Sequence, residues 1–400
     1  MKKLLFGLIL TLISCSLFAK TKTTFNKANA IVDEGKTEYK IITYQQLAQE
    51  MRTGWNLGNT LEATAGYTNY SETSWGMPMT TEDMIAGLAK SGIKTIRIPI
   101  SWHNHLSDKN YTINPSWMKR VKQIVDWAIK YDMYVIINIH HDNYAYNKKM
   151  NNGGGFYPTK ENFDESAAFL TNIWSQISLA FNNGYDEHLI FETLNEPRLC
   201  GTNNEWNNDE NSQLCKDAAD IINQFNQLIV DTIRESGGNN AVRFITCPGM
   251  QASPKSALLD SYKIPTDKKN NTGRILVSVH MYDPYNFAME SPGSKEFTNR
   301  DKSSLMDVFN HLESKFLKNG TGLIIDEYGA TNKDNLEARL DWFKFFITAT
   351  HKKGMVACLW DNQLTEIKNN QYSDLYGFYN RNKQEWFFPE ILSTIMESSK

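Results

Sequence analysis

The sequence has few cysteines and no excess of charge of either sign. Its 400 residues include 5 Cys, too few for a disulfide-held fold, so a hydrophobic core must stabilise it. The formal net charge of −3 gives no basic surface for nucleic acid and favours a neutral partner. No Pro/Ser/Thr-rich linker follows residue 40, and no segment after residue 19 is a candidate for spanning a membrane.

The cysteines that follow residue 19 do not suggest a metal site. Cys200 and Cys215 flank a polar loop and are candidates for a disulfide in an oxidising compartment. Cys247 and Cys358 end apolar runs, and we expect them to be buried thiols. No close Cys or His pair has the spacing of zinc ligands. We therefore expect no metal and no cofactor.

Residues 1–19 have the features of an export signal. Two lysines are followed by an apolar stretch over residues 4–12, which is too short to span a bilayer. Residues 12–15 resemble a bacterial lipobox, which would place a lipid anchor on Cys15, whereas ordinary processing would cleave after Ala19. Both routes remain open, and both predict an exported protein that is secreted, periplasmic or lipid-anchored. Residues 20–40 are polar and Lys/Thr-rich, as expected of a tether.

One pattern then repeats along residues 41–400: a short apolar run, a polar loop and a longer helical segment. Several of the apolar runs are almost continuously hydrophobic, as is typical of parallel strands covered on both faces. The predicted strands are 54–57, 94–99, 133–140, 189–195, 242–247, 275–280, 322–326 and 355–360.

Helical periodicity fills the intervals between these strands. The predicted helices begin near residues 81 and 115 and cover 163–181, 218–233, 303–317, 336–350 and 386–396. Eight strands that alternate with helices predict a single (β/α)8 barrel over residues 41–400. A doubly wound open sheet is the alternative, but the loop after the first strand, residues 54–59, lacks the glycine spacing of a dinucleotide site.

Two glutamates, Glu196 and Glu327, follow apolar strand-like runs. A carboxylate at the exit of a buried strand is partly desolvated and therefore costly. Two of them on one rigid scaffold suggest an acid and a base matched for breaking a glycosidic bond. The ends of parallel barrel strands meet on one face, where such sites are built. The other polar or aromatic residues at these ends are Asn59, Glu62, Arg97, His140, His141, Asn195, His280, Tyr282, Trp360 and Asn362.

The sequence resembles glycoside hydrolase family 5, which includes many cellulases. The segments that carry the resemblance occur in order and span nearly the whole exported chain. They are residues 54–59 (GWNLGN), 96–99 (IRIP), 138–141 (NIHH), 194–197 (LNEP), 280–282 (HMY), 326–329 (DEYG) and 359–360 (LW). Residues 60–62 and Trp75 with the following glycine look most like subfamily 4, which contains endoglucanases and xyloglucanases.

The resemblance implies hydrolysis with retention, with Glu196 as general acid/base and Glu327 as nucleophile. Arg97 and the phenol of Tyr282 are expected to stabilise the nucleophile's charge. The acid must hold a proton, so we expect burial and the charge of Glu327 to raise the pKa of Glu196.

Two further residues are expected to assist. Asn195 is placed to bond the 2-hydroxyl of the reacting sugar, and His280 is expected to orient Glu196 or Tyr282. Asp326 precedes the nucleophile and, by strand alternation, is expected to point away from it and to be structural.

Substrate positioning is assigned to the remaining residues at the strand ends and to two tryptophans in loops. These residues are Asn59, Glu62, Trp75, His140, His141, Trp206, Trp360 and Asn362. An indole ring offers an apolar plate for a pyranose, while amides and imidazoles bond its hydroxyls. The His140-His141 pair suggests a metal, but successive strand residues point to opposite faces and cannot chelate one ion.

The sequence thus predicts an exported endo-β-1,4-glucanase that acts on a β-linked polysaccharide or oligosaccharide. Cellulose-type chains, mixed-linkage glucan and xyloglucan are the expected substrates, and a monomer is the default state. A β-mannanase or xylanase on the same barrel is the nearest alternative. A non-catalytic glycan-binding lipoprotein and a metal-dependent hydrolase are the alternatives from other classes. The sequence leaves endo against exo action open.

Overall fold

The computed structural model describes residues 22–64, 71–144, 154–268, 273–366 and 374–400, and its strands form a closed barrel. The strands are β1 (Thr53–Asn56), β2 (Thr95–Ile98), β3 (Tyr134–Asn138), β4 (Leu189–Glu192), β5 (Ile245–Pro248), β6 (Ile275–Met281), β7 (Leu323–Tyr328) and β8 (Val356–Leu359). Each is parallel to the next, and β8 pairs with β1. The predicted (β/α)8 barrel is confirmed.

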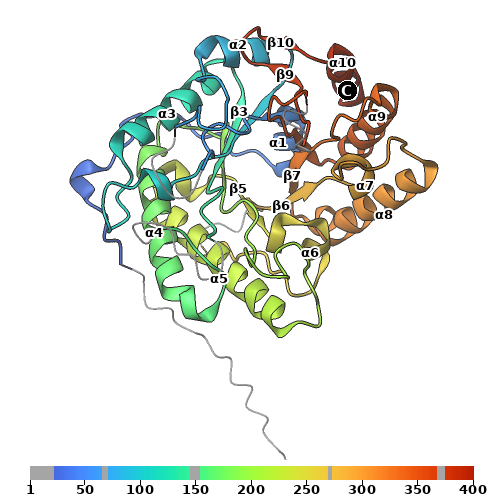
Figure 1. Cartoon of the computed structure of the whole chain (residues 1–400). Helices are drawn as coiled ribbons and strands as arrows, with labels where there is room; N and C mark the ends of the chain where they lie inside the picture. The colour runs from blue at the N-terminus through green and yellow to red at the C-terminus, as the bar shows by residue number, and fades with distance from the viewer. Residues whose placement is uncertain (1–21, 65–70, 145–153, 269–272, 367–373) are drawn as a thin grey trace, which may run out of the picture.

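Helices surround the barrel, as Figure 1 shows from one end. They are α1 (Tyr44–Met51), α2 (Glu82–Lys90), α3 (Pro115–Lys130), α4 (Phe163–Ala180), α5 (Gln213–Glu235), α6 (Pro254–Leu258), α7 (Tyr285–Ala288), α8 (Asn299–Lys315), α9 (Leu336–Lys352) and α10 (Pro389–Ser398). A small hairpin of β9 (Tyr379–Asn380) and β10 (Glu385–Trp386) precedes α10. Among the described residues, no helix is both long and apolar enough to cross a membrane.

Every residue of the eight barrel strands is buried, because one face meets the barrel interior and the other meets the helices. The larger core cluster lies between strands and helices, and a second one fills the lower interior. Helix α1, which the sequence reasoning missed, contributes Tyr44, Leu47 and Met51 to this second cluster. It begins with a capping box of Thr43 and Gln46.

Strand β7 contains a bulge at the point where the nucleophile was predicted. Ile325 pairs with Val279 of β6, but Glu327 rather than Asp326 pairs with the next residue, His280. The extra residue breaks the alternation on which the sequence expectation rested. Asp326 does not point away from the site as expected: it is fully buried, and Glu192 and Arg97 lie near enough for their charges to act on its carboxyl.

The segment before α1 lies along the outside of the barrel. The backbone N–H groups of Thr24 and Phe25 donate to Asn172 Oδ1 of α4, at 2.7 and 3.0 Å. Asp33 accepts hydrogen bonds from two backbone N–H groups in the loop that follows α4. The stretch expected to be a polar tether is therefore held against α4 from residue 24 onward.

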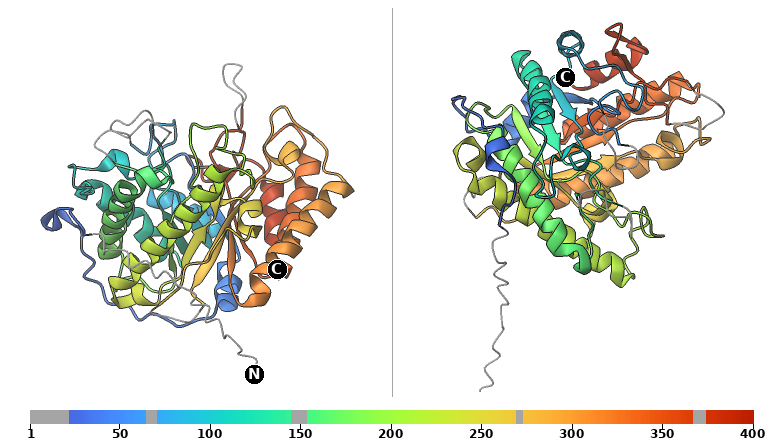
Figure 2. Two further views of the ribbon diagram at one scale, coloured as in Figure 1. Left: turned by 90° about the horizontal axis from the view of Figure 1, so that it is seen from below. Right: turned by 60° about the vertical axis from the view of Figure 1, so that its left-hand side comes forward.

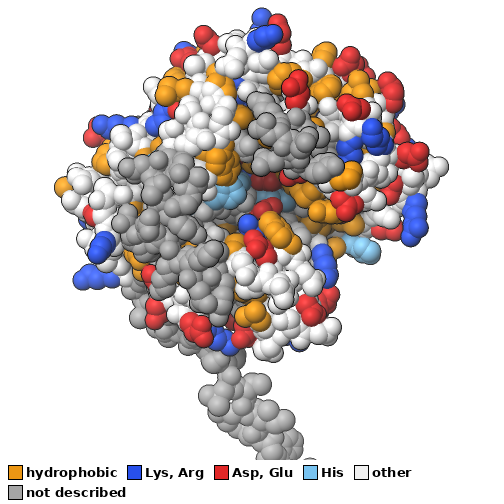
Figure 3. Space-filling view, in the orientation of Figure 1, with side chains coloured by type: hydrophobic (Ala, Val, Ile, Leu, Met, Phe, Trp, Pro, Cys, Tyr) orange, Lys and Arg blue, Asp and Glu red, His pale blue; other side chains and the backbone are white. Residues whose placement is uncertain are grey.

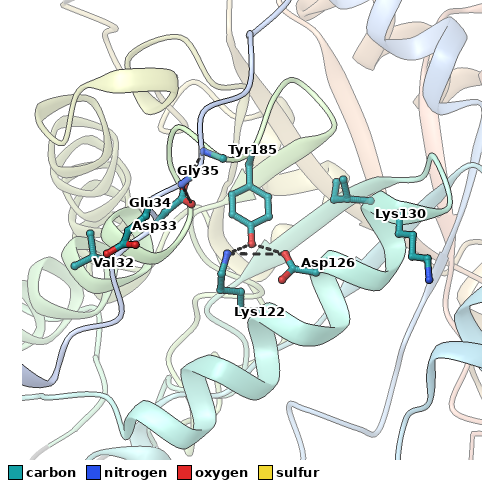
Figure 4. Close-up of a pocket in the computed structure, with 10 residues that line it drawn as sticks. Val32, Asp33, Glu34, Gly35, Lys122, Asp126, Lys130 and Tyr185 are labelled. Carbon is teal, nitrogen blue, oxygen red and sulfur yellow. Dashed lines mark hydrogen bonds and ion pairs between the residues drawn. The ribbon is translucent and has the colours of Figure 1, made fainter.

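A pocket of about 600 Å3 opens beside this segment, and Figure 4 shows its lining residues. The Tyr185 hydroxyl lies between the amino group of Lys122 and the carboxylate of Asp126, both from α3. These hydrogen bonds connect α3 to the loop before β4.

The described cysteines are all free thiols. Cys200 and Cys215 pack in one small buried cluster, but they are not joined, so the disulfide that the sequence allowed is not formed. Cys247 and Cys358 are fully buried, as expected.

Candidate active site

Glu196 and Glu327 face each other where the strands end. Glu196 lies in the loop after β4, and Glu327 lies near the end of β7. One carboxylate oxygen of each and a ring nitrogen of His280 lie within 4.8 Å of one another. In the space-filling view of Figure 3, the centre of this face is hollowed, and acidic and histidine side chains lie in the hollow. Carboxyl groups about 5–5.5 Å apart are typical of hydrolysis with retention.

Two donors hold the carboxylate of Glu327. Nη1 of Arg97 donates to Glu327 Oε1 at 2.7 Å, and the Tyr282 hydroxyl donates to Glu327 Oε2 at 2.8 Å. Burial and the charge of Glu327 raise the pKa of Tyr282 well above its usual value, so the phenol keeps its proton and remains a donor. Both partners named from the sequence are therefore in contact with Glu327, which is itself only 5% exposed.

Glu196 is bonded to His280, whose Nδ1 lies 2.8 Å from Oε1 of the glutamate and 3.5 Å from Oε2 of Glu327. Burial raises the pKa of Glu196, but the hydrogen bond and charge of His280, together with Arg198, outweigh burial and hold that pKa below its usual value. Burial lowers the pKa of His280, but the charge of Glu327 and the bond to Glu196 raise it above its ordinary 6.5. The expected raised pKa of Glu196 is thus wrong for the free protein, because the contact with His280 and the charge of Arg198 favour the ionised carboxylate.

Arg97 joins the two halves of the site from beneath. Its guanidinium donates to both oxygens of Glu192, at 2.6 and 2.8 Å, and to the side-chain oxygens of Asn56 and Asn195. Sequence reasoning missed Glu192 and Asn56. The one signal for Glu192 was a charge inside an apolar strand, since a buried carboxylate requires a partner.

His140, His141 and Trp360 lie together at the ends of β3 and β8. The His140 and Trp360 rings are nearly parallel, at 11° with centroids 6.1 Å apart, and His141 contacts Trp75 at 5.6 Å. Burial and neighbouring positive groups lower the pKa of His140 well below its usual value and that of His141 to about 4, so both rings are neutral. Within the described residues, neither belongs to a cluster of three potential metal ligands.

The side chains of Glu62 and Asn362 serve their own loops. Glu62 is fully buried and accepts hydrogen bonds from the backbone N–H groups of Asn59 and Thr60. Asn362 donates to the carbonyl of Asp374 at 2.8 Å and accepts from a backbone N–H two residues on. Both side chains are thus held by hydrogen bonds within their own loops, and their expected role in positioning substrate stays a prediction. Asn59 is half-buried and adopts a left-handed φ of 58°.

Gly58 allows the first loop to approach Trp360 closely. A Cβ at this position would lie 2.6 Å from the carbonyl oxygen of Asp361 and 3.0 Å from the indole ring. A larger residue would clash with the Asp361 backbone and crowd the indole ring, so only glycine allows this close approach.

Trp206 stands apart from this group, in the loop after Glu196. Its side chain is 60% exposed, and the guanidinium of Arg198 lies 4.2 Å from its ring centroid. Sequence reasoning also missed Arg198, whose side chain extends back to Glu196. Nη1 of Arg198 donates to the backbone carbonyl of Glu196 at 3.0 Å and lies 3.8 Å from the Glu196 carboxylate.

Comparison with known proteins places this geometry in context. The family model described as cellulase (glycosyl hydrolase family 5) matches residues 59–365. Endoglucanase B of Clostridium cellulovorans is 35% identical over 386 residues, which covers 95% of this chain and 81% of the relative.

Solved structures agree with this match. A family 5 lichenase variant from Caldicellulosiruptor sp. F32, in complex with cellotetraose, is 36% identical with a TM-score of 0.84, covering 92% of this chain and 98% of that one. A subfamily 4 broad-specificity endoglucanase from Ruminococcus champanellensis with bound cellotriose is also 36% identical, with a TM-score of 0.81, covering 90% of this chain and 100% of that one.

Proposed function

This chain belongs to the cellulase family, glycosyl hydrolase family 5, and is a glycoside hydrolase; we propose that it is a retaining endo-β-1,4-glucanase. The observation that carries the proposal is the spacing of Glu196 and Glu327, within 4.8 Å across the hollow. That gap is too narrow for a water molecule to attack from the opposite side of the sugar, so one carboxylate must itself attack. The cello-oligosaccharides bound to the related structures support a β-glucan as substrate.

In the first step Glu327 attacks the anomeric carbon. Its donors, Arg97 and Tyr282, hold one carboxylate oxygen each and so fix the orientation of the carboxylate. Glu196 gives the leaving oxygen a proton, and His280, whose Nδ1 lies 2.8 Å from Glu196 Oε1, is placed to supply it. His280 is thus placed to protonate Glu196 again, although the pKa of Glu196 itself is low.

In the second step water attacks the glycosyl ester of Glu327, with Glu196 as base. Forming the ester neutralises Glu327, which removes one of the charges that raise the pKa of His280.

Asn195 already uses its Oδ1 to accept from Arg97 at 2.7 Å, so its NH2 group is the part that meets the 2-hydroxyl of the reacting sugar. Arg97 therefore orients both the nucleophile and the group that binds the 2-hydroxyl.

Substrate is positioned by the aromatic and imidazole groups of the rim. We propose that Trp360 is the plate for the reacting sugar, that neutral His140 and His141 bond its hydroxyls, and that Trp75 and Trp206 serve sites farther along the groove. Since neutral imidazoles both donate and accept, they suit the hydroxyls of an uncharged glycan.

The test is a panel of soluble polysaccharides, with Glu327→Ala, Glu196→Ala and Glu313→Gln, a surface control far from the hollow. Carboxymethyl-cellulose, lichenan and xyloglucan should be cut by the wild type and the control but not by Glu327→Ala. Added azide should give an α-glycosyl azide with Glu327→Ala and a β-glycosyl azide with Glu196→Ala. Full activity of Glu327→Ala would overturn the mechanism, and cleavage of glucomannan or xylan alone would favour a mannanase or xylanase. NMR during the first minutes of reaction should show the β-anomer of the product, which checks retention. A rapid fall in viscosity with few new reducing ends checks endo action.

We also propose export, which rests on the sequence of residues 1–19 alone. Mass spectrometry of the mature N-terminus separates the two routes, because an acylated Cys15 and a free Lys20 differ in both sequence and mass. An unprocessed N-terminus in the producing cell would contradict export.

A further inference from the structure

Arg198 makes more contacts around Glu196 than a surface ion pair requires. It follows Glu196 by two residues, and its own backbone N–H is fixed by Asn143 Oδ1 at 2.7 Å. Its guanidinium reaches the carbonyl of Glu196 at 3.0 Å and lies 3.8 Å from its carboxylate. The side chain is only 16% exposed, so solvent screens its charge less than at an open surface.

The outer side of the same guanidinium supports Trp206. The Arg198 Nε is 3.3 Å from Glu205 Oε1, and the guanidinium carbon lies 4.2 Å from the Trp206 ring centroid. Glu205 is itself held, since Oε2 accepts from the Gly201 N–H at 2.8 Å and its carbonyl accepts from Gln251 at 3.0 Å. With the guanidinium on one side and 60% of the side chain exposed, the tryptophan has a supported ring that is open to a ligand.

The position of the loop indicates which sugar would use this ring. Glu196 protonates the oxygen of the leaving sugar, and Arg198 lies 3.8 Å from its carboxylate. We therefore place Arg198 and Trp206, which follow Glu196 in the loop, on the leaving-group side, whereas Asn195, which precedes it, meets the sugar that becomes attached to Glu327. An aromatic face and an Arg guanidinium together form a plate suited to an uncharged pyranose.

We propose that Arg198 is a positioning residue that couples the leaving-group side of the groove to the acid–base glutamate, by supporting Trp206 and by placing a permanent positive charge beside Glu196. This inference rests on the proposed function. It concerns a residue that lies outside the set of groups in contact with the reacting atoms.

The charge of Arg198 adds to the effect of His280, whose hydrogen bond and charge lower the pKa of Glu196 more than Arg198 does. His280 Nδ1 lies 2.8 Å from Glu196 and also 3.5 Å from Glu327, so its charge acts on both carboxylates. His141 is neutral, with a pKa of about 4. Arg97 is committed to Glu192 and Glu327. Arg198 is therefore a second positive group beside Glu196, in addition to His280, and its loss should raise the pKa of Glu196 and make it a weaker acid.

The experiment compares Arg198→Gln, Arg198→Lys and Trp206→Ala on two substrates. Cellopentaose fills the leaving-group side and needs a proton on the leaving oxygen, whereas 2,4-dinitrophenyl β-cellobioside needs neither. For cellopentaose, kcat/KM falls on the alkaline side of its pH profile, and in Arg198→Gln this alkaline limb should lie about one pH unit higher than in the wild type. A shift of that size is expected when a close opposite charge is removed. Arg198→Lys and Trp206→Ala should leave the limb in place but raise KM several-fold.

For the dinitrophenyl substrate, kcat/KM of all three variants should stay within about twofold of the wild type, because neither the plate nor the acid is used. Arg120→Gln is the matched control: Arg120 also pairs with a glutamate, Glu72, and lies 5.3 Å from the Trp127 ring, but on α3. It should leave both the limb and KM unchanged.

An unchanged limb in Arg198→Gln, or the same upward shift in Arg198→Lys, would overturn the inference. An equal loss of kcat/KM on both substrates would also overturn it, because that pattern indicates a merely structural role. Failure of the proposed function would look different, since the wild type itself would then not cleave cellopentaose.

Discussion

Arg97 and Glu192 form a doubly bonded ion pair that is completely buried beneath the two candidate catalytic glutamates. Nε and Nη2 of the arginine donate to the two carboxylate oxygens at 2.6 and 2.8 Å, and neither side chain is exposed. The pair connects β2 to β4, and Nη1 of the same arginine donates to Glu327. Glu327, the proposed nucleophile, is therefore positioned by a charge that is itself held in place by Glu192.

Replacing Glu192 should destabilise the protein strongly. Glu192→Gln leaves Arg97 buried without its main counter-charge, and removing one partner of a buried pair typically costs about 3–5 kcal/mol. Urea unfolding of the wild type and the variant measures the loss in the free energy of unfolding. Glu82→Gln, which removes an exposed ion pair with Lys130, is the control, and its free energy of unfolding should equal that of the wild type. Equal stability of Glu192→Gln and wild type would show that Arg97 is compensated in another way.

Removing the hydroxyl of Tyr282 should impair chemistry more than binding. Tyr282→Phe deletes the 2.8 Å hydrogen bond to Glu327 Oε2 and leaves the ring in place. Loss of one preorganised donor typically lowers kcat by about 10²-fold, and we expect little change in KM. Tyr376→Phe is the matched control, because its ring packs on Tyr282 at 5.5 Å but its hydroxyl donates to the Ala288 carbonyl. A larger loss in Tyr376→Phe than in Tyr282→Phe would contradict this assignment.

The sequence predicted the barrel because parallel strands buried on both faces leave a local pattern of short, almost continuous apolar runs. It also predicted that Glu196, Glu327, Arg97 and Tyr282 would meet, because the ends of such strands must share one face. Both inferences need only the order of elements along the chain.

Other features could not be predicted because they depend on contacts between distant segments. The pairing of Arg97 with Glu192 requires knowing which interior residues of β2 and β4 lie at one level. The bulge that brings Asp326 inward is set by the register of β7 against β6. The low pKa of Glu196 depends on His280, 84 residues away in the chain. The inward turn of Glu62 depends on a loop conformation that composition does not specify.

His280 should make stability depend on pH in a defined window. Its folded pKa is raised above 6.5, so the folded state binds the proton more tightly than the unfolded chain. The resulting stabilisation is fully present below pH 6.5 and is lost as the pH rises through the folded pKa. The free energy of unfolding of wild type minus that of His280→Asn, measured by urea at several pH values, should therefore be largest near pH 6 and decline above it. A difference that grows with pH would contradict this assignment.

Glu62 should show a pH dependence of the same sign for a different reason. Burial raises its pKa from 4.5 to about 7, despite the hydrogen bonds from its own loop. The proton bound in the folded state stabilises it fully below pH 4.5, and this contribution disappears as the pH rises through about 7. Relative to Glu62→Gln, which does not titrate, the wild type should lose up to about 3 kcal/mol between pH 4.5 and pH 9. A pH-independent difference between the two proteins would show that Glu62 is ionised throughout.

The thiols of Cys200 and Cys215 should remain free in the purified protein. Both are buried in the cluster that includes Tyr157 and Leu199, and burial raises the pKa of Cys200 to about 11, so little reactive thiolate forms at neutral pH. Alkylation of the native protein should therefore label neither, while alkylation after unfolding without reductant should label both. Cys247 and Cys358 serve as internal controls, because they lie apart in the barrel wall and must also react only after unfolding. If Cys200 and Cys215 alone require reductant, an oxidising compartment has joined them, and the loop between them, which carries Glu205 and Trp206, would be held by a covalent bond rather than by Arg198.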